Sequence, residues 1–224
     1  MQRPIIDIPP DFAGKLNMNW DIEWRGQSAG DTNLGVTRTT YNAFPRWVGE
    51  PAMVLVHSEI AKWRALRARA QGLVGIYRVR ILDPVAAIDY AAGTPAPIPF
   101  DGDIWFDDGT GFENDLAAFA VKAANPGATT IRLYCETPGG PPNIGQIMSH
   151  DDWPFMVTAV RQVGTWIFDC DIQMPLRSTI RYGDLVYWEG RGLFEAAEEG
   201  MGNPTYAASR VSQVSLSFRE VLNR

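Results

Sequence analysis

The clearest pattern in the chain is the alternation of apolar and polar residues between Gly145 and Trp188. One run has apolar side chains at every second position, with aspartates between them: Trp166, Phe168, Cys170 and Ile172 against Asp169 and Asp171. A period of two residues is typical of a β-strand with one buried face. The turn Val163-Gly164-Thr165 joins this run to a second, β-branched one, Phe155–Val160. The pattern therefore predicts a small antiparallel β-module.

The same pattern predicts strands in other parts of the chain. They are expected at residues 20–24, 35–41, 52–57, 73–82, 129–135 and 185–188, and around 214–218 near the end of the chain. Three segments are rich in proline or glycine. An extended arm at 1–19 and a turn-rich entry at 84–115 are expected, and the third segment, 189–203, is glycine-rich and partly acidic. Residues 115–124 fit either a short helix or a strand.

One segment has helical periodicity. Its apolar positions follow helical spacing: Ile60, Trp63, Leu66 and Ala70. We expect Ser58 as the N-cap, Glu59 in the first turn and Gly72 just beyond the C-terminus. The other sides of this helix carry four cations, Lys62, Arg64, Arg67 and Arg69.

The composition changes at Asp83-Pro84, where the turn-rich segment begins. The last strand needs a partner, and the strands of the N-terminal block can supply one. We therefore expect a mainly β protein with a discontinuous first domain, 1–83 and 204–224. This domain would be a β-barrel or sandwich with one packed helix, and 84–203 would be a small inserted β domain.

Composition and charge narrow the function classes. The chain has 224 residues and a formal net charge of −6, which argues against a nucleic-acid coat. Folding at this length buries about 70% of the unfolded chain's surface, so no disulfide is required. Cys135 and Cys170 are expected to be buried thiols, with a disulfide as the alternative. No signal peptide or apolar run long enough to span a membrane is found, so we expect a soluble protein made in a cytoplasm.

Two groups of residues could carry chemistry. Asp101 and Asp103 fit the first ligand positions of a calcium-binding loop, but Trp105 occupies the next position. Asp-Gly turns explain the acidic run 101–115 better than a cation site or a carboxylate-based hydrolase does. His150 precedes two aspartates, but the chain has no nucleophile motif to accompany it. We therefore expect no catalytic, cofactor-binding or metal-binding residue.

The tryptophans and the basic helix are candidates for binding rather than catalysis. Trp20, Trp63 and Trp166 lie on apolar periodicities and are expected in the core. Trp105, in the turn-rich segment, is the best candidate for an exposed ligand contact, for example with a sugar ring. The cations Lys62, Arg64, Arg67 and Arg69 form either a solvated face or a subunit interface. A nucleic-acid contact is the least favoured alternative.

Two sets of short motifs occur together in this chain. The first consists of Phe44-Pro45-Arg46-Trp47, the helical residues 60–66 and the strand residues 73–76. The second consists of Gly127-Ala128-Thr129-Thr130, residues 145–147 and 157–160, Pro175-Leu176-Arg177 and Gly183-Asp184-Leu185-Val186. The Phe-Asp-Gly repeat at 100–109 and the ending at 215–220 accompany them. Together they resemble tail proteins of long-tailed bacteriophages and of phage-derived gene transfer particles.

The resemblance implies a distal tail (Dit-like) protein. Such a protein has a β-barrel belt domain that closes into a homo-oligomeric ring, commonly of six copies, and an inserted β domain that faces outward. The ring connects the tail tube to the baseplate hub or fibres, which implies a location at the virion tail tip. No residue-level site is carried over, because the function of this family lies in its interfaces. A carbohydrate-binding module for host-surface recognition is the alternative.

A ring requires two different surfaces on each subunit, because head-to-tail contacts are heterologous. The basic helix at 59–69 offers one such surface. The acidic segments 101–115 and 195–199 are the expected counterparts of opposite charge.

Overall fold

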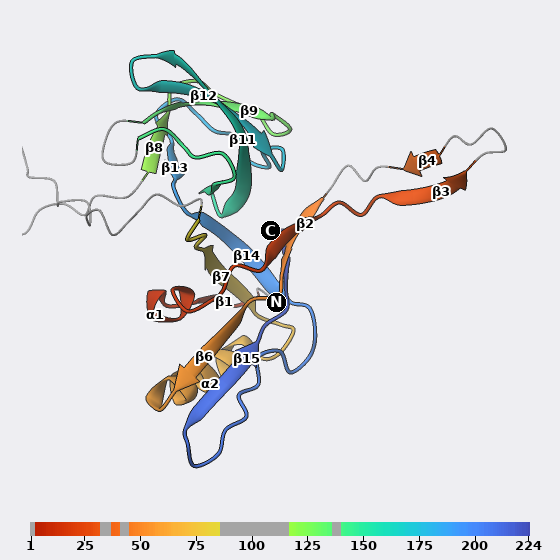
Figure 1. Cartoon of the computed structure of the whole chain (residues 1–224), viewed down its shortest axis with the longest axis vertical. Coiled ribbons are helices and arrows are strands. Elements are labelled where there is room, and N and C mark those ends of the chain that lie inside the picture. Colours follow the sequence, from red (N-terminus) through yellow and green to blue (C-terminus); the bar gives the residue numbers. More distant parts are fainter. Residues whose placement is uncertain (1–2, 32–36, 41–44, 86–116, 136–139) are drawn as a thin grey trace, which may run out of the picture. The chain divides into compact units, whose positions relative to one another are not determined.

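The computed structural model describes residues 3–31, 37–40, 45–85, 117–135 and 140–224 (Figure 1). Most of the regular structure is β, which confirms the expected fold class. The chain forms two compact units. Unit 1 comprises Met1–Arg80 and Gly192–Arg224, and unit 2 comprises Ile81–Arg191. Both ends of the chain therefore belong to one unit, and the other is inserted between them.

Unit 1 is built around an open six-stranded sheet. Its order is β1 (Ile5–Asp7), β7 (Ile76–Ile81), β14 (Gly190–Ala196), β16 (Phe218–Glu220), β5 (Arg46–Gly49) and β2 (Trp20–Glu23). β1 runs parallel to β7, and the pairs β14–β16, β16–β5 and β5–β2 are antiparallel.

Two smaller sheets and two helices complete unit 1. The small sheets pair β6 (Ala52–Val56) with β15 (Val211–Ser215), and β3 (Gln27–Asp31) with β4 (Thr37–Thr40). The helices are α1 (Pro10–Ala13) and α2 (Ser58–Ala70). The pairing of β15 with β6, and of β16 with β5, confirms that the last strands find their partners in the N-terminal block.

The core of unit 1 is aromatic. One face of the six-stranded sheet carries Trp20, Phe194, Phe218 and Tyr77, whose rings lie at centroid distances between 4.7 and 6.2 Å. Trp63 of α2 is fully buried against Phe12, and its indole N–H donates a hydrogen bond to the Gly202 carbonyl. Trp63 is therefore in the core as expected, whereas Trp20 packs against Phe194 and Phe218 but is only half-buried.

Unit 2 is a closed six-stranded barrel. Its order is β10 (Ile147–His150), β11 (Trp153–Gly164), β12 (Ile167–Gln173), β9 (Thr130–Tyr134), β8 (Ala117–Ala120) and β13 (Leu185–Tyr187). The long strand β11 has two register irregularities opposite β12, and such bulges bend a strand around a barrel. Alternate residues of β9 and β12 fill the interior, among them Leu133, Phe168 and Cys170. The closed barrel thus lies in the inserted unit, whereas the sheets of unit 1 remain open.

The structure corrects several expectations about local elements. Residues 1–19 include a parallel strand and a short helix, because β1 pairs with β7 and Pro10 occupies a first-turn position where its missing N–H costs nothing. The glycine-rich segment 189–203, where no strand was expected, contains strand β14, which pairs with β16. Consequently the chain returns to unit 1 at Gly192 rather than at the expected boundary, residue 204.

Two predictions about single residues are also wrong. Trp166 is not in the core: it follows the end of β11 with φ of 58°, and 39% of its surface is exposed. Helix α2 begins at Ser58, so the N-cap is His57, and no side chain caps it. Instead, the Glu59 carboxylate accepts a hydrogen bond from the backbone N–H of Val56, and Gln71 adopts the left-handed conformation at the C-terminus.

Candidate subunit-contact surfaces

Helix α2 has an exposed side on unit 1 that consists of small side chains flanked by cations. Ile60, Trp63 and Ala70 are buried beneath the helix. On the opposite side, three exposed alanines follow one another at i, i+4 and i+7, Ala61, Ala65 and Ala68. Exposed cations flank this stripe, Lys62, Arg64 and Arg69. We call these six residues the helix ridge.

Arg67 does not belong to the helix ridge, although it was expected beside the other cations. Its guanidinium group is half-buried and donates hydrogen bonds to the carbonyls of Gly200 and Met201 and to Oδ1 of Asn203, at 2.7 to 3.0 Å. Arg67 therefore attaches the segment after β14 to the helix. Arg64 is bound less extensively: its guanidinium group donates a hydrogen bond to the Tyr206 hydroxyl at 3.0 Å.

The acidic segment 195–199 is engaged within unit 1. Glu195 forms ion pairs with Arg219 at 2.7 Å and with Arg3 at 2.8 Å. Glu198 and Glu199 line a hollow beside α2 together with Arg64 and Arg67. Glu195 is therefore paired within its own chain, and Glu198 and Glu199 lie beside α2 of the same chain, so the acidic counterpart for a neighbouring copy is better sought on another surface.

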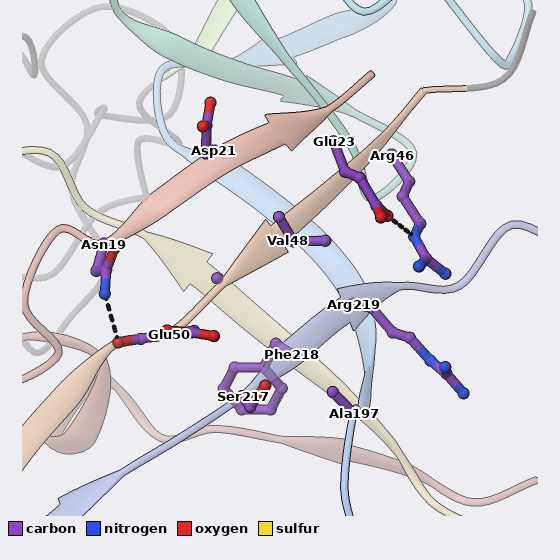
Figure 2. Close-up of a pocket in the computed structure, with 11 residues that line it drawn as sticks. Asn19, Asp21, Glu23, Arg46, Val48, Glu50, Ala197, Ser217, Phe218 and Arg219 are labelled. Atoms are coloured by element: carbon purple, nitrogen blue, oxygen red, sulfur yellow. Dashed lines mark hydrogen bonds and ion pairs between the residues drawn. The ribbon is translucent and has the colours of Figure 1, made fainter. Parts of the chain in front are cut away.

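That surface is the polar face of the six-stranded sheet (Figure 2). It lines a hollow of about 440 Å³ over β2, β5 and β16. Its charged and polar side chains are Asn19, Asp21, Glu23, Arg46, Glu50, Ser217 and Arg219, with Val48 between them. We call this set the polar sheet face.

The strand register explains how these side chains come together. Asp21 lies opposite Val48, Val48 opposite Arg219, and Arg219 opposite Glu195, so one row crosses four strands. The next row pairs Glu23 with Arg46. Residues directly opposite in adjacent strands point to the same side of a sheet, which places the whole row on one surface.

The two arginines of the polar sheet face have acidic partners in their own chain. Arg46 Nε donates to Glu23 Oε2 at 2.6 Å, and Figure 2 shows the guanidinium groups of Arg46 and Arg219 along the same side of the hollow. Arg219 Nε donates to Glu195 Oε1 at 2.7 Å. Asp21 and Glu50 are exposed, and neither enters an ion pair within the described part of the chain. The surplus charge at this surface is therefore negative.

The histidine and the two cysteines that could have carried chemistry have structural roles in unit 2. His150 lies at the end of β10, not in a loop; its Nδ1 is 2.9 Å from the Leu185 carbonyl, and its Nε2 lies 3.3 Å from Asp151 and 3.8 Å from Asp184. Because a carbonyl only accepts, Nδ1 is the donor in this contact, and the ring connects β10 to β13.

The two cysteines are free and buried inside unit 2, so the disulfide alternative is wrong. Burial raises the pKa of both Cys135 and Cys170 to about 12. A thiol with so high a pKa remains protonated at neutral pH and is a poor nucleophile or metal ligand.

Some candidates from the sequence cannot be placed. Trp105 and the acidic run 101–115 lie outside the described residues. Within the described ranges, no group of three or more His, Cys, Asp or Glu side chains is arranged to hold a metal ion. Neither described helix is long and apolar enough to cross a membrane.

Sequence reasoning identified the cations of α2 but missed both the alanine stripe and the polar sheet face. The stripe could have been found from the i, i+4, i+7 spacing of Ala61, Ala65 and Ala68. The polar sheet face depends on the register between strands that are far apart in the chain, which no local pattern reveals. The chain is therefore a mainly β protein of two units, and its candidate contact surfaces are the helix ridge and the polar sheet face.

No protein-family model and no curated protein matches the chain.

Proposed function

We propose that this chain is a structural component of a phage tail tip, a distal tail protein that forms a homo-oligomeric ring. The ring, expected to contain six copies, connects the tail tube to the baseplate hub or fibres. Its partners are other copies of the chain, the tail tube protein and the hub or fibre proteins. The proposal assigns no catalytic, metal or cofactor role to any residue. It locates the protein at the virion tail tip, after synthesis in the cytoplasm of the host bacterium.

The observation that carries the proposal is the insertion of unit 2 into unit 1. Both ends of the chain build unit 1, and a separate barrel begins after β7 and ends before the chain re-enters the same sheet in β14. The motif resemblance implies such an insertion into a ring-forming domain, but it places the barrel in that domain, whereas here the closed barrel is the inserted unit and the sheets of unit 1 are open.

The sheets of the two units support different roles. A closed barrel has no free edges, so unit 2 is suited to being an independent module. The six-stranded sheet of unit 1 ends on the short strands β1 and β2, whose outer edges can pair with another chain. Unit 1 is therefore the better candidate for contacts between copies.

The test is the mass of the assembly as a function of concentration. Sedimentation velocity and light scattering of the full chain, from micromolar to millimolar concentration, should show a closed oligomer of one defined size. Negative-stain images of the same sample should show rings. A chain that stays monomeric over this range, and that forms no ring in the presence of its tail tube protein, would contradict the proposal.

Recognition of carbohydrate is the second candidate function, and exposed aromatic residues in unit 2 favour it. Tyr182 is 77% exposed, Phe119 49% and Trp166 39%, and aromatic side chains with free faces often mark binding surfaces. Glycan-array binding by a monomeric chain, lost on Tyr182→Ala or Phe119→Ala, would favour this function over ring formation.

A further inference from the structure

The helix ridge and the polar sheet face lie on opposite sides of the six-stranded sheet. Helix α2 covers the aromatic side, because Arg67 and Ala68 line one hollow with Tyr77, whose ring contacts Phe218 edge-on at 5.5 Å. Arg219, the next residue in β16, points to the reverse side with the polar sheet face. A subunit with two different surfaces on opposite sides can make head-to-tail contacts.

Both surfaces have small or short side chains near their middle. Alanines along the centre of the helix ridge allow its backbone to approach a partner closely, and no long side chain projects between the flanking cations. Figure 2 shows Val48 near the middle of the hollow, with the small residues Ala197 and Ser217 toward one end. Small side chains on both surfaces would let the helix backbone approach the sheet closely, with the alanines over Val48.

The charges of the two surfaces are also complementary. Lys62 and Arg69 are seven residues apart, which is two turns, or about 10 Å along the helix axis. Asp21 lies opposite Val48, so Glu50 is its diagonal neighbour on the same face, at roughly 7–8 Å between Cα atoms. Long flexible cationic side chains at this spacing can reach both carboxylates.

We propose that the helix ridge of one copy docks into the polar sheet face of the next copy, with Lys62 and Arg69 paired to Asp21 and Glu50. This inference rests on the proposed ring and names the two surfaces that close it. It replaces the acidic segment 195–199 as the counterpart of the basic helix, because Glu195 is paired with Arg3 and Arg219, and Glu198 and Glu199 line a hollow beside α2 of their own chain. Arg67 has no part in the contact.

Two charge-reversed variants test the contact. The helix variant carries Lys62→Glu and Arg69→Glu, and the sheet variant carries Asp21→Lys and Glu50→Lys. Each brings like charges together at every interface, which opposes assembly. The concentration needed for half-assembly, measured by light scattering, should rise at least about tenfold for each variant alone. All four positions are exposed, and circular dichroism and the thermal midpoint should show that both variants fold like the wild type.

An equimolar mixture of the two variants makes the test specific. The acidic helix of the first variant fits the basic sheet of the second, and the unchanged helix of the second fits the unchanged sheet of the first. The mixture should therefore assemble at close to the wild-type concentration, with the two variants alternating in the ring. Failure of the mixture to assemble, while each variant is folded, would overturn the proposed pairing.

A matched control reverses two exposed cations of unit 2, Lys122→Glu and Arg181→Glu, which changes the net charge as much as the helix variant does. This control should assemble like the wild type. If the helix and sheet variants also assemble like the wild type, the ring exists but its contact lies elsewhere, and the inference is wrong. If the wild type itself never assembles, the proposed function is wrong.

Discussion

The four cations of helix α2 are equivalent in the sequence but have two different roles in the structure. Lys62, Arg64 and Arg69 are exposed, whereas Arg67 is half-buried and donates to three oxygen atoms of the segment 200–203. The difference follows from the helical repeat: Arg67 lies close to the buried stripe of Ile60 and Trp63, and the other three lie away from it.

Replacing Arg67 with alanine should therefore destabilise unit 1. The change removes the charged donor that binds the backbone carbonyls of Gly200 and Met201. We therefore expect a loss of about 1–3 kcal/mol in the free energy of unfolding. The same change at the exposed Arg69 should alter stability by no more than about 0.5 kcal/mol. Urea denaturation of both variants measures the difference, and equal effects would show that the contacts of Arg67 add nothing.

At the scale of elements, the strands of the barrel are joined by side chains as well as by backbone hydrogen bonds. Arg132 of β9 lies directly opposite Asp169 of β12 on the outside of the barrel. Its guanidinium group donates to both carboxylate oxygens, at 2.6 and 2.8 Å. Such a bidentate pair fixes the relative position of two strands more strictly than a single hydrogen bond does.

This pair makes the stability of unit 2 depend on acid pH. The hydrogen bonds and charge of Arg132 hold the pKa of Asp169 below its ordinary value of 3.8. Because the folded-state pKa is the lower one, the contribution is complete above pH 3.8 and is lost as the pH falls through the folded-state pKa.

Asp169→Asn should accordingly be less stable than the wild type at neutral pH, and the difference should shrink once the pH drops below 3.8. Urea denaturation at a series of pH values, with Asp171→Asn as the comparison, measures this effect. Asp171 lacks the bidentate arginine contact of Asp169: its Oδ1 accepts from the Thr130 hydroxyl at 2.9 Å and lies 3.3 Å from the Arg161 guanidinium group. A stability difference that stays constant down to the lowest pH would contradict this role of Asp169.

The elements also show where local pattern is sufficient and where it is not. The apolar alternation of Val214, Leu216 and Phe218 predicted buried positions correctly, and all three are at most 2% exposed. However, this run is divided between two strands that belong to different sheets. β15 pairs with β6, and β16 pairs with β14 and β5. Alternation reports which side of the backbone is buried; it carries no information about the partner strand.

At the scale of the whole molecule, the inserted barrel enters and leaves unit 1 through neighbouring strands. β7 ends at Ile81 and β14 begins at Gly190, and these strands are adjacent in the six-stranded sheet. A Cβ atom added at Gly190 would lie 3.2 Å from the Cβ of Ile81. A module whose two connections lie side by side can be inserted into a sheet without separating its strands.

We therefore expect residues 81–191 to fold without the rest of the chain. The isolated segment should show cooperative thermal unfolding and a dispersed amide spectrum, because the barrel is closed and has its own apolar interior. The control is the same segment with Leu133→Asp, which places a charge at a fully buried position and should abolish the transition. A disordered wild-type segment would show that the barrel depends on unit 1.

The sequence alone determined the local properties of this protein: the mainly β composition, the helix near residues 58–71 and the alternation that marks the buried faces of the strands. These follow from the repeat of the backbone, which is two residues in a strand and 3.6 in a helix. Only the tertiary structure decided which strands pair, that the inserted segment forms the closed barrel, and that Arg67 is bound while Arg69 is exposed. It also placed Trp166 at a turn and gathered the polar sheet face from residues 19–23, 46–50 and 217–219. Each of these depends on contacts between segments that are distant in the chain, and a local repeat does not encode such contacts.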